Sequence, residues 1–177
     1  VISEINDALK NLRDWAAPQR VKTPLYLLGS KSHIILQPKG LNLIIAPWNF
    51  PFNLTIGPLI SAIAAGNCAV LKPSELTPNC EQLILKMITE LFPPEEIIVI
   101  AGGVKETTQL LDLAWDHIFF TGSPQVGKIV MKAASNHLTP VTLELGGKNP
   151  VIVDNTANLK DTAQKLIWGK LINNGQS

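Results

Sequence analysis

The sequence is short of cysteine, of aromatic residues and of any run of like charge. Among 177 residues there are two cysteines and one tyrosine, and the formal net charge is +1. This balance gives no reason to expect a nucleic acid or an anionic membrane as partner. No apolar stretch reaches the roughly 20 uncharged residues that a membrane-spanning helix needs. The most apolar region, 41–71, is interrupted by Pro47, Pro51, Pro58 and Gly66.

The few sulfur and imidazole groups do not predict a metal or disulfide site. Cys68 and Cys80 form no CxxC pair, and His33, His117 and His137 lack the spacing of metal ligands. Two free thiols suit a reducing compartment, so we expect a cytoplasmic protein with both thiols buried as small apolar groups. No signal peptide is visible, and the first residue is valine rather than methionine, so we expect the native start to lie upstream.

From residue 41 onward, short apolar runs alternate with segments of helical periodicity. The predicted strands are 41–46, 68–71, 97–100, 117–120 and 141–145, and the predicted helices are 53–65, 78–92, 105–113 and 124–135. This alternation predicts right-handed βαβ units, and continuously apolar strands fit a parallel sheet that is covered on both faces. We therefore predict an α/β fold: a Rossmann-like open parallel sheet with flanking helices.

The two ends of the chain have a different texture. Apolar spacing predicts an amphipathic helix over 2–17, and the runs 25–28 and 33–37 flank a Gly-Ser-Lys-Ser turn that is typical of a β-hairpin. A further short strand is predicted over 150–153 and a helix over 159–172. The predicted divisions are 1–20, a helix; 21–38, a hairpin; 39–146, the sheet domain; and 147–177, the start of a second domain.

An open parallel sheet binds ligands beyond the carboxyl ends of its strands, so the strand-to-helix turns are the candidate site. After the first strand, Asn49 lies between Pro47 and Pro51, which stiffen the turn. A side-chain amide held on a rigid turn can donate to a developing oxyanion. The alternative is that Asn49 only caps a helix or a turn.

The turn after the second strand carries charge. Lys72 stands at the end of the strand and Glu75 follows three residues later. A lysine in this place can reach a ribose or a phosphate, and a nearby glutamate can accept from ribose hydroxyls. The alternative is an exposed ion pair between the two.

Two further turns carry candidate groups. Ser123 as N-cap and Pro124 in the first turn predict a helix whose free N–H groups face a pyrophosphate, although neither GxGxxG nor a P-loop is present. An ordinary helix cap is the alternative. After the fifth strand, Glu144 is flanked by leucines where the sheet ends, which suits a general base. The alternative is a paired structural carboxylate.

Taken together and in this order, the four turns resemble the aldehyde dehydrogenase superfamily. The resemblance rests on Pro-Trp-Asn-Phe-Pro at 47–51, Lys-Pro-Ser-Glu at 72–75, Phe-Thr-Gly-Ser at 120–123 with Gly127, and Leu-Glu-Leu-Gly-Gly-Lys at 143–148. Finer likeness over 52–56, 103–108, 116–118 and 137–145 is to the class 3, or fatty-aldehyde, branch. The resemblance covers nearly the whole chain.

The resemblance implies a reaction and a set of residues. A cysteine thiolate attacks an aldehyde, hydride passes to NAD, with NADP possible, and water hydrolyses the thioester. Asn49 matches the oxyanion-stabilising amide and Glu144 the glutamate that activates water. The implied cofactor-binding residues are Pro47, Trp48, Lys72, Ser74, Glu75, Gly122, Ser123, Gly127, Leu145 and Gly146. A carboxylate such as Glu75 should repel a 2′-phosphate and so favour NAD.

The nucleophile of the family follows Gly-Gln-x, and here Gly-Gln-Ser occupies 175–177. We therefore expect the cysteine just after Ser177, and neither Cys68 nor Cys80 falls on the motif. By the same resemblance, 21–38 is a hairpin of oligomerisation type, 39–146 binds the cofactor, and 147–177 begins a catalytic domain whose apolar side chains are exposed or paired with another chain. We expect a homo-oligomer that oxidises aldehydes when whole, and no turnover by residues 1–177 alone.

Two rival functions stay open from the sequence. A CoA-acylating semialdehyde dehydrogenase resembles this chain, but such enzymes generally lack the glutamate at the position of Glu144, because CoA rather than water takes the acyl group. A non-catalytic dinucleotide-binding module is the other reading, and it would be favoured by a residue other than cysteine after Ser177.

Overall fold

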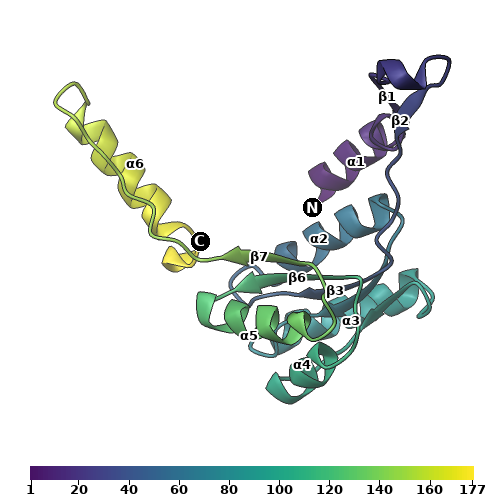
Figure 1. Ribbon diagram of the computed structural model, residues 1–177. Coiled ribbons are helices and arrows are strands. Elements are labelled where there is room, and N and C mark those ends of the chain that lie inside the picture. The colour runs from purple at the N-terminus through teal and green to yellow at the C-terminus, as the bar shows by residue number, and fades with distance from the viewer.

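The computed structural model describes residues 1–177 and is built on one parallel sheet. Its strands are β3 (Leu41–Ile45), β4 (Cys68–Lys72), β5 (Ile97–Val99), β6 (His117–Gly122) and β7 (Val141–Leu145). They are all parallel and lie in the order β5-β4-β3-β6-β7 (Figure 1). The prediction of an open parallel sheet is confirmed. The strand order reverses beside β3, which is where sheets of this kind bind their ligands.

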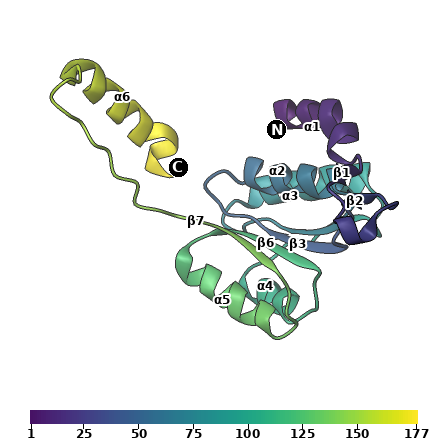
Figure 2. The ribbon, with the colours of Figure 1, turned by 45° about the horizontal axis from the view of Figure 1, so that its top comes forward.

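Four helices cover the two faces of this sheet. They are α2 (Asn53–Ala64) and α3 (Pro78–Leu91) on one face, and α4 (Val104–Leu111) and α5 (Pro124–Ser135) on the other (Figure 2). Neighbouring residues of β3 serve opposite cores, since Leu43 packs with Val130 of α5 whereas Ile44 packs with Ile84 of α3. Side chains alternate across a strand, so a strand buried on both faces is mostly apolar along its length.

The N-terminal part adds one helix and one hairpin. The helix α1 (Ile2–Trp15) packs on α2 and has no fully buried residue. The hairpin pairs β1 (Gln19–Val21) with β2 (Ser32–Ile34) in antiparallel fashion.

The predicted hairpin strand over 25–28 is wrong, because residues Leu25–Leu27 form the 3-10 turn η1. Pro24 begins this turn with φ −58°, and the N–H of Leu27 donates to its carbonyl at 2.9 Å. The strand that pairs with β2 is instead Gln19–Val21. It is more polar than residues 25–28, so an apolar pattern does not reveal it.

Beyond β7 the chain leaves the sheet. The helices α6 (Leu159–Leu171) and η2 (Ile172–Gly175) follow an extended segment, and α6 projects away from the rest of the molecule (Figure 1). The predicted strand over 150–153 is wrong, because no neighbouring strand pairs with it, and Ile152 is 89% exposed. As expected, α6 exposes its apolar side chains, Trp168 among them. None of the helices combines the length and apolar character needed to span a bilayer.

Shortening one core side chain tests this packing. Leu43 is fully buried between the sheet and α4 and α5, so Leu43→Ala should lower the free energy of unfolding by about 2–5 kcal/mol. The matched control is Leu83→Ala on α3, where the leucine is exposed and a change within about 0.5 kcal/mol is expected. Urea denaturation followed by circular dichroism measures both, and equal losses would contradict the described core.

Candidate functional site

The register of the strands brings the four predicted turns to one edge of the sheet. Ile45 pairs with Lys72 on one side and with Phe120 on the other, and Thr121 pairs with Glu144. The strands β3, β4, β6 and β7 therefore end side by side. Because they are parallel, the polypeptide leaving each of them emerges at the same, carboxyl edge.

The turn after β3 meets the C-terminal residues of the chain. The side-chain amide of Asn49 donates to the carbonyl oxygen of Gln176 at 2.5 Å, and the amide of Asn173 donates to the carbonyl of Asn49 at 2.7 Å. Pro47 and Asn49 are half-buried, whereas Trp48 is 46% exposed. Asn49 caps no helix, since α2 begins after Phe52. Its amide faces a peptide carbonyl instead.

Lys72, at the end of β4, is buried and not part of an exposed ion pair. Its Nζ donates to the carbonyl of Pro73 at 2.5 Å, and it forms no salt bridge with Glu75. Burial lowers the pKa of the Lys72 ammonium, and the carboxylates of Glu75, Glu81 and Glu106 oppose that shift. The ion-pair alternative is therefore wrong. A buried ammonium with one protein acceptor keeps donors for a further partner.

The rest of this turn is held by a local hydrogen bond. The hydroxyl of Ser74, which is buried, accepts from the N–H of Leu76 at 3.3 Å. Glu75 is exposed and lies beside Gly103, where an added Cβ would come within 3.8 Å of its Cγ. The turn after β4 therefore touches the turn after β5.

Two carboxylates of this edge were not among the predicted site residues. Glu81 of α3 accepts from the N–H of Gly102 at 3.0 Å, and Glu106 of α4 accepts from the N–H of Gly103 at 2.7 Å. The backbone N–H groups of Glu106 and Gly103 lower the pKa of the Glu106 carboxyl. A glutamate three residues after a helix cap is a known capping pattern, so the contact of Glu106 could have been predicted from the sequence. Nothing in the sequence indicates the long-range contact of Glu81.

The start of α5 has the predicted cap. The hydroxyl of Ser123 accepts from the N–H of Val126 at 3.3 Å, and Pro124 stands in the first turn. The Oγ1 atom of Thr121, two residues earlier, is buried without a protein partner. A helix N-terminus favours an anion, and an unpaired buried hydroxyl favours a further polar group. Both features point to a ligand at this edge.

Glycines let α5 and β7 approach each other. Gly127 is buried, and a Cβ there would lie 2.9 Å from the Leu145 side chain. At Gly122, a Cβ would lie still closer to a neighbour, 2.5 Å from the ring of Phe120. Leu145 is 41% exposed, and Gly146 is exposed as well.

Glu144 stands at the end of β7 and is exposed. It forms no salt bridge, so the alternative of a paired structural carboxylate is wrong. A free carboxylate at this edge is available to a water or to a ligand.

Neither cysteine is placed like a nucleophile. Both thiols are half-buried, which corrects the expectation that they are fully buried. Cys68 opens β4 and so lies at the opposite, amino edge. Cys80 lies in the first turn of α3 and packs against the core below it, and burial raises the pKa of its thiol. A raised pKa disfavours the reactive thiolate.

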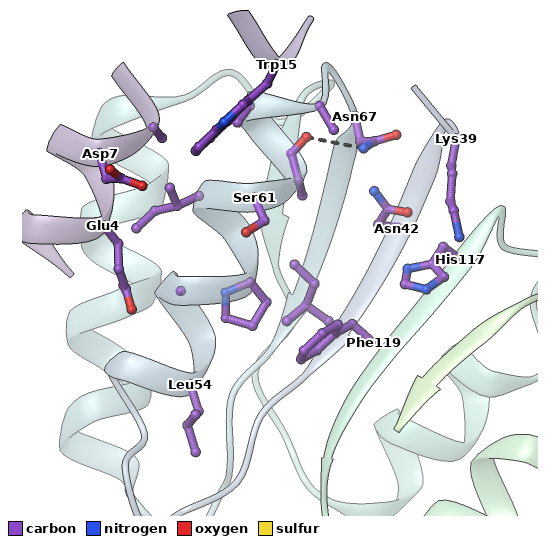
Figure 3. Close-up of a pocket in the computed structure, with 18 of the residues that line it drawn as sticks. Glu4, Asp7, Trp15, Lys39, Asn42, Leu54, Ser61, Asn67, His117 and Phe119 are labelled. Carbon is purple, nitrogen blue, oxygen red and sulfur yellow. Dashed lines mark hydrogen bonds between the residues drawn. The ribbon is translucent and has the colours of Figure 1, made fainter. Parts of the chain in front are cut away.

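A second feature is a cleft of about 930 Å³ between α1, α2 and the strands β3 and β6. Figure 3 shows Trp15, Ser61, Asn42 and Phe119 around it, with His117 and Lys39 at its rim. It runs along α2, from Leu54 near the Asn49 turn to Ser61 near the end of the helix. The cleft therefore has one end close to the carboxyl edge.

Comparison with known proteins gives one consistent family. A model of the aldehyde dehydrogenase family matches residues 2–177. The 4,4′-diaponeurosporen-aldehyde dehydrogenase of Staphylococcus aureus is 53% identical over 99% of this chain and 38% of its own length. The human aldehyde dehydrogenase family 3 member B1 is 49% identical over 98% of this chain and 37% of its own.

Solved structures agree with this. The substrate-bound state of Staphylococcus aureus AldH superimposes with a TM-score of 0.96 at 53% identity, over 99% of this chain and 38% of that one. A Mycobacterium tuberculosis aldehyde dehydrogenase complexed with NAD+ gives 0.85 at 28% identity, over 98% and 36%. The chain thus spans little more than a third of the proteins that it matches.

The histidine at the rim of the cleft gives a testable pH dependence. Burial, and then the ammonium of Lys39, lower the pKa of His117. In the unfolded chain this histidine is protonated below about pH 6.5, whereas in the folded chain it takes up the proton only at lower pH. Stability is therefore lost as the pH falls from about 6.5 through the pKa of the folded state. His117→Gln keeps a polar partner for Thr142 and should weaken this loss.

Thermal melts of both proteins between about pH 7.5 and about pH 5 measure the effect. His137→Gln, at an exposed histidine, is the matched control and should follow the parent protein. Parallel curves for His117→Gln and the parent would show that this histidine carries no pH dependence.

Proposed function

Because the chain belongs to the aldehyde dehydrogenase family, we propose that the whole protein oxidises an aldehyde to a carboxylic acid with NAD(P)+ through a cysteine thioester. One observation carries the proposal: the amide of Asn49 lies against the carbonyl of Gln176. The residue that follows Ser177 would then emerge beside Asn49, at the edge that also carries Glu144. A cysteine at that position has the amide, the carboxylate and the dinucleotide edge within one site.

The residues of the edge fit a dinucleotide. Lys72 has unused donors, the hydroxyl of Thr121 is buried without a partner, and α5 presents its N-terminus. Bound NAD(P)+ would supply the hydride acceptor. We assign its binding to Pro47, Trp48, Lys72, Ser74, Glu75, Gly122, Ser123, Gly127, Leu145 and Gly146. The free carboxylate of Glu75 leads us to favour NAD over NADP.

The chain's own groups divide the reaction into two steps. When the thiolate attacks the aldehyde carbonyl, the amide of Asn49 donates to the oxygen that becomes negative, together with the backbone N–H of the cysteine. After hydride has left, Glu144 accepts a proton from the water that attacks the thioester carbon, and the thiolate is released. The turn that holds Asn49 between two prolines keeps the donor in place for the first step.

Substrate and assembly follow from the parts around the edge. The cleft along α2 begins beside Phe50, the neighbour of Asn49, and Leu54 and Phe119 give it apolar walls. We therefore propose an apolar aldehyde whose body lies in this cleft.

The exposed β1–β2 hairpin has unpaired edges suited to strand pairing with a second copy, so we propose a homo-oligomer. We propose that 39–146 binds the cofactor and that 147–177 belongs to the catalytic domain.

Two variants of the whole protein test the assignment of the two steps. Asn49→Ala should slow hydride transfer about 100- to 1000-fold, because an oxyanion donor is lost. Glu144→Gln should leave hydride transfer intact and slow hydrolysis about 100-fold or more. Stopped-flow absorbance of NADH should therefore show a stoichiometric burst only in Glu144→Gln.

Controls separate the proposal from its rivals. Residues 1–177 alone should give no NADH, since Cys68 lies at the amino edge and Cys80 packs against the core under α3 with a raised thiol pKa. Added CoA should yield no acyl-CoA from the parent protein. A steady aldehyde-dependent rate from residues 1–177, or acyl-CoA as the main product, would contradict the proposed mechanism.

A further inference from the structure

The buried ammonium of Lys72 is surrounded by more negative charge than it can balance. Three carboxylates, those of Glu75, Glu81 and Glu106, attract it, and only Glu81 among them is buried. One positive and three negative charges leave the cluster with a net charge of about −2 when all four groups are ionised. Glu144 is not among the charges that act on Lys72.

Two of the carboxylates also fix the backbone of the turn after β5. Glu81 accepts from the N–H of Gly102 and Glu106 from the N–H of Gly103, at 3.0 and 2.7 Å. Gly102 has φ +130°, and a Cβ there would lie 2.6 Å from the Cγ of Glu106. The glycine therefore permits the carboxylate to fold back over the turn, and the turn cannot move without losing both bonds.

The fixed turn lies against Glu75. A Cβ on Gly103 would come within 3.8 Å of the Cγ of Glu75 and within 4.0 Å of its Oε1. The backbone of Gly103 thus forms one wall beside the carboxylate that follows β4. Glu106 reaches the same wall from α4, by accepting from the N–H of Gly103.

We propose that Glu106 is a positioning residue that, with Glu81, sets the choice between NAD and NADP: it holds the Gly102–Gly103 turn beside Glu75 and adds negative charge around Lys72, which disfavours a 2′-phosphate. The inference rests on the proposed dinucleotide site and extends it to two residues outside the strand-to-helix motif of Lys72 and Glu75. A phosphate monoester carries nearly two negative charges at neutral pH, whereas the free 2′-hydroxyl carries none. Only NADP therefore meets the repulsion.

The variant Glu106→Gln separates charge from shape. Its amide oxygen can still accept from the N–H of Gly103, so the turn is kept while one negative charge is lost. Its Kd for NADP+ should fall about 3- to 10-fold, and its Kd for NAD+ should stay within about twofold. Glu106→Ala loses the hydrogen bond too and should weaken NAD+ binding as well.

The matched control is Glu95→Gln. Glu95→Gln removes the same single negative charge as Glu106→Gln. Glu95 is exposed and precedes β5, so it lies at the opposite edge of the sheet. Isothermal titration calorimetry of the whole protein with NAD+ and NADP+ should show no change in the ratio of the two Kd values for this variant. A merely structural role of Glu106 would move both Kd values together and leave the ratio alone.

Salt supplies a second measurement that needs no variant. In the parent protein the ratio of Kd for NADP+ to Kd for NAD+ should fall between about 0.05 M and about 0.5 M NaCl, because salt screens the repulsion. If NAD+ binds the parent protein, two results overturn the inference. One is an unchanged ratio of the two Kd values in Glu106→Gln, and the other is an equal change of that ratio in Glu95→Gln. Failure of NAD+ to bind the parent protein overturns the proposed cofactor site itself.

Discussion

Parallel pairing in register of β3 with β4 and β6, and of β6 with β7, is the constraint on which the rest of the structure depends. It aligns Ile45 with Lys72 and with Phe120, and Thr121 with Glu144. An amide, an ammonium, a helix start and a carboxylate that are far apart in the chain are therefore delivered to one edge. A shift of one residue in any of these strands would turn its side chains to the other face and separate the groups.

The position of that edge is made precise by a few close contacts. Gly127 brings α5 against Leu145, Glu106 closes the turn at Gly103, and Glu81 holds Gly102 from α3. None of these contacts adds much apolar burial. They set where the turns lie relative to one another, which the two apolar cores alone would leave free. The site is thus specified by polar and steric contacts on a scaffold that is stabilised by packing.

Sequence reasoning found the sheet because continuous apolar strands and helical periodicity carry a strong local signal. It placed the strands to within two residues at their ends, and the Ser123 cap by its side chain and the following proline. It failed where tertiary context decides. Residues 25–28 look like a strand but form a 3-10 turn, and 150–153 have no partner to pair with.

Charge was harder to place than shape. The sequence left open an exposed ion pair between Lys72 and Glu75, yet Lys72 is buried. The carboxylates that oppose the shift of its pKa come from α3 and α4 as well as from its own turn. Contacts over such separations leave no spacing pattern in the chain. Asn49 and Gln176, which are also in contact, are still farther apart along the chain. Only the family resemblance linked those two segments before the structure was known.

The central claim, that one edge of one sheet holds the dinucleotide, is tested most directly by hydrogen–deuterium exchange with and without NAD+. The account predicts slower exchange in the turns 46–52, 72–77 and 121–127, and no change at the amino edge around 39–41 and 66–68. Protection confined to the amino edge, or spread evenly over the molecule, would contradict it.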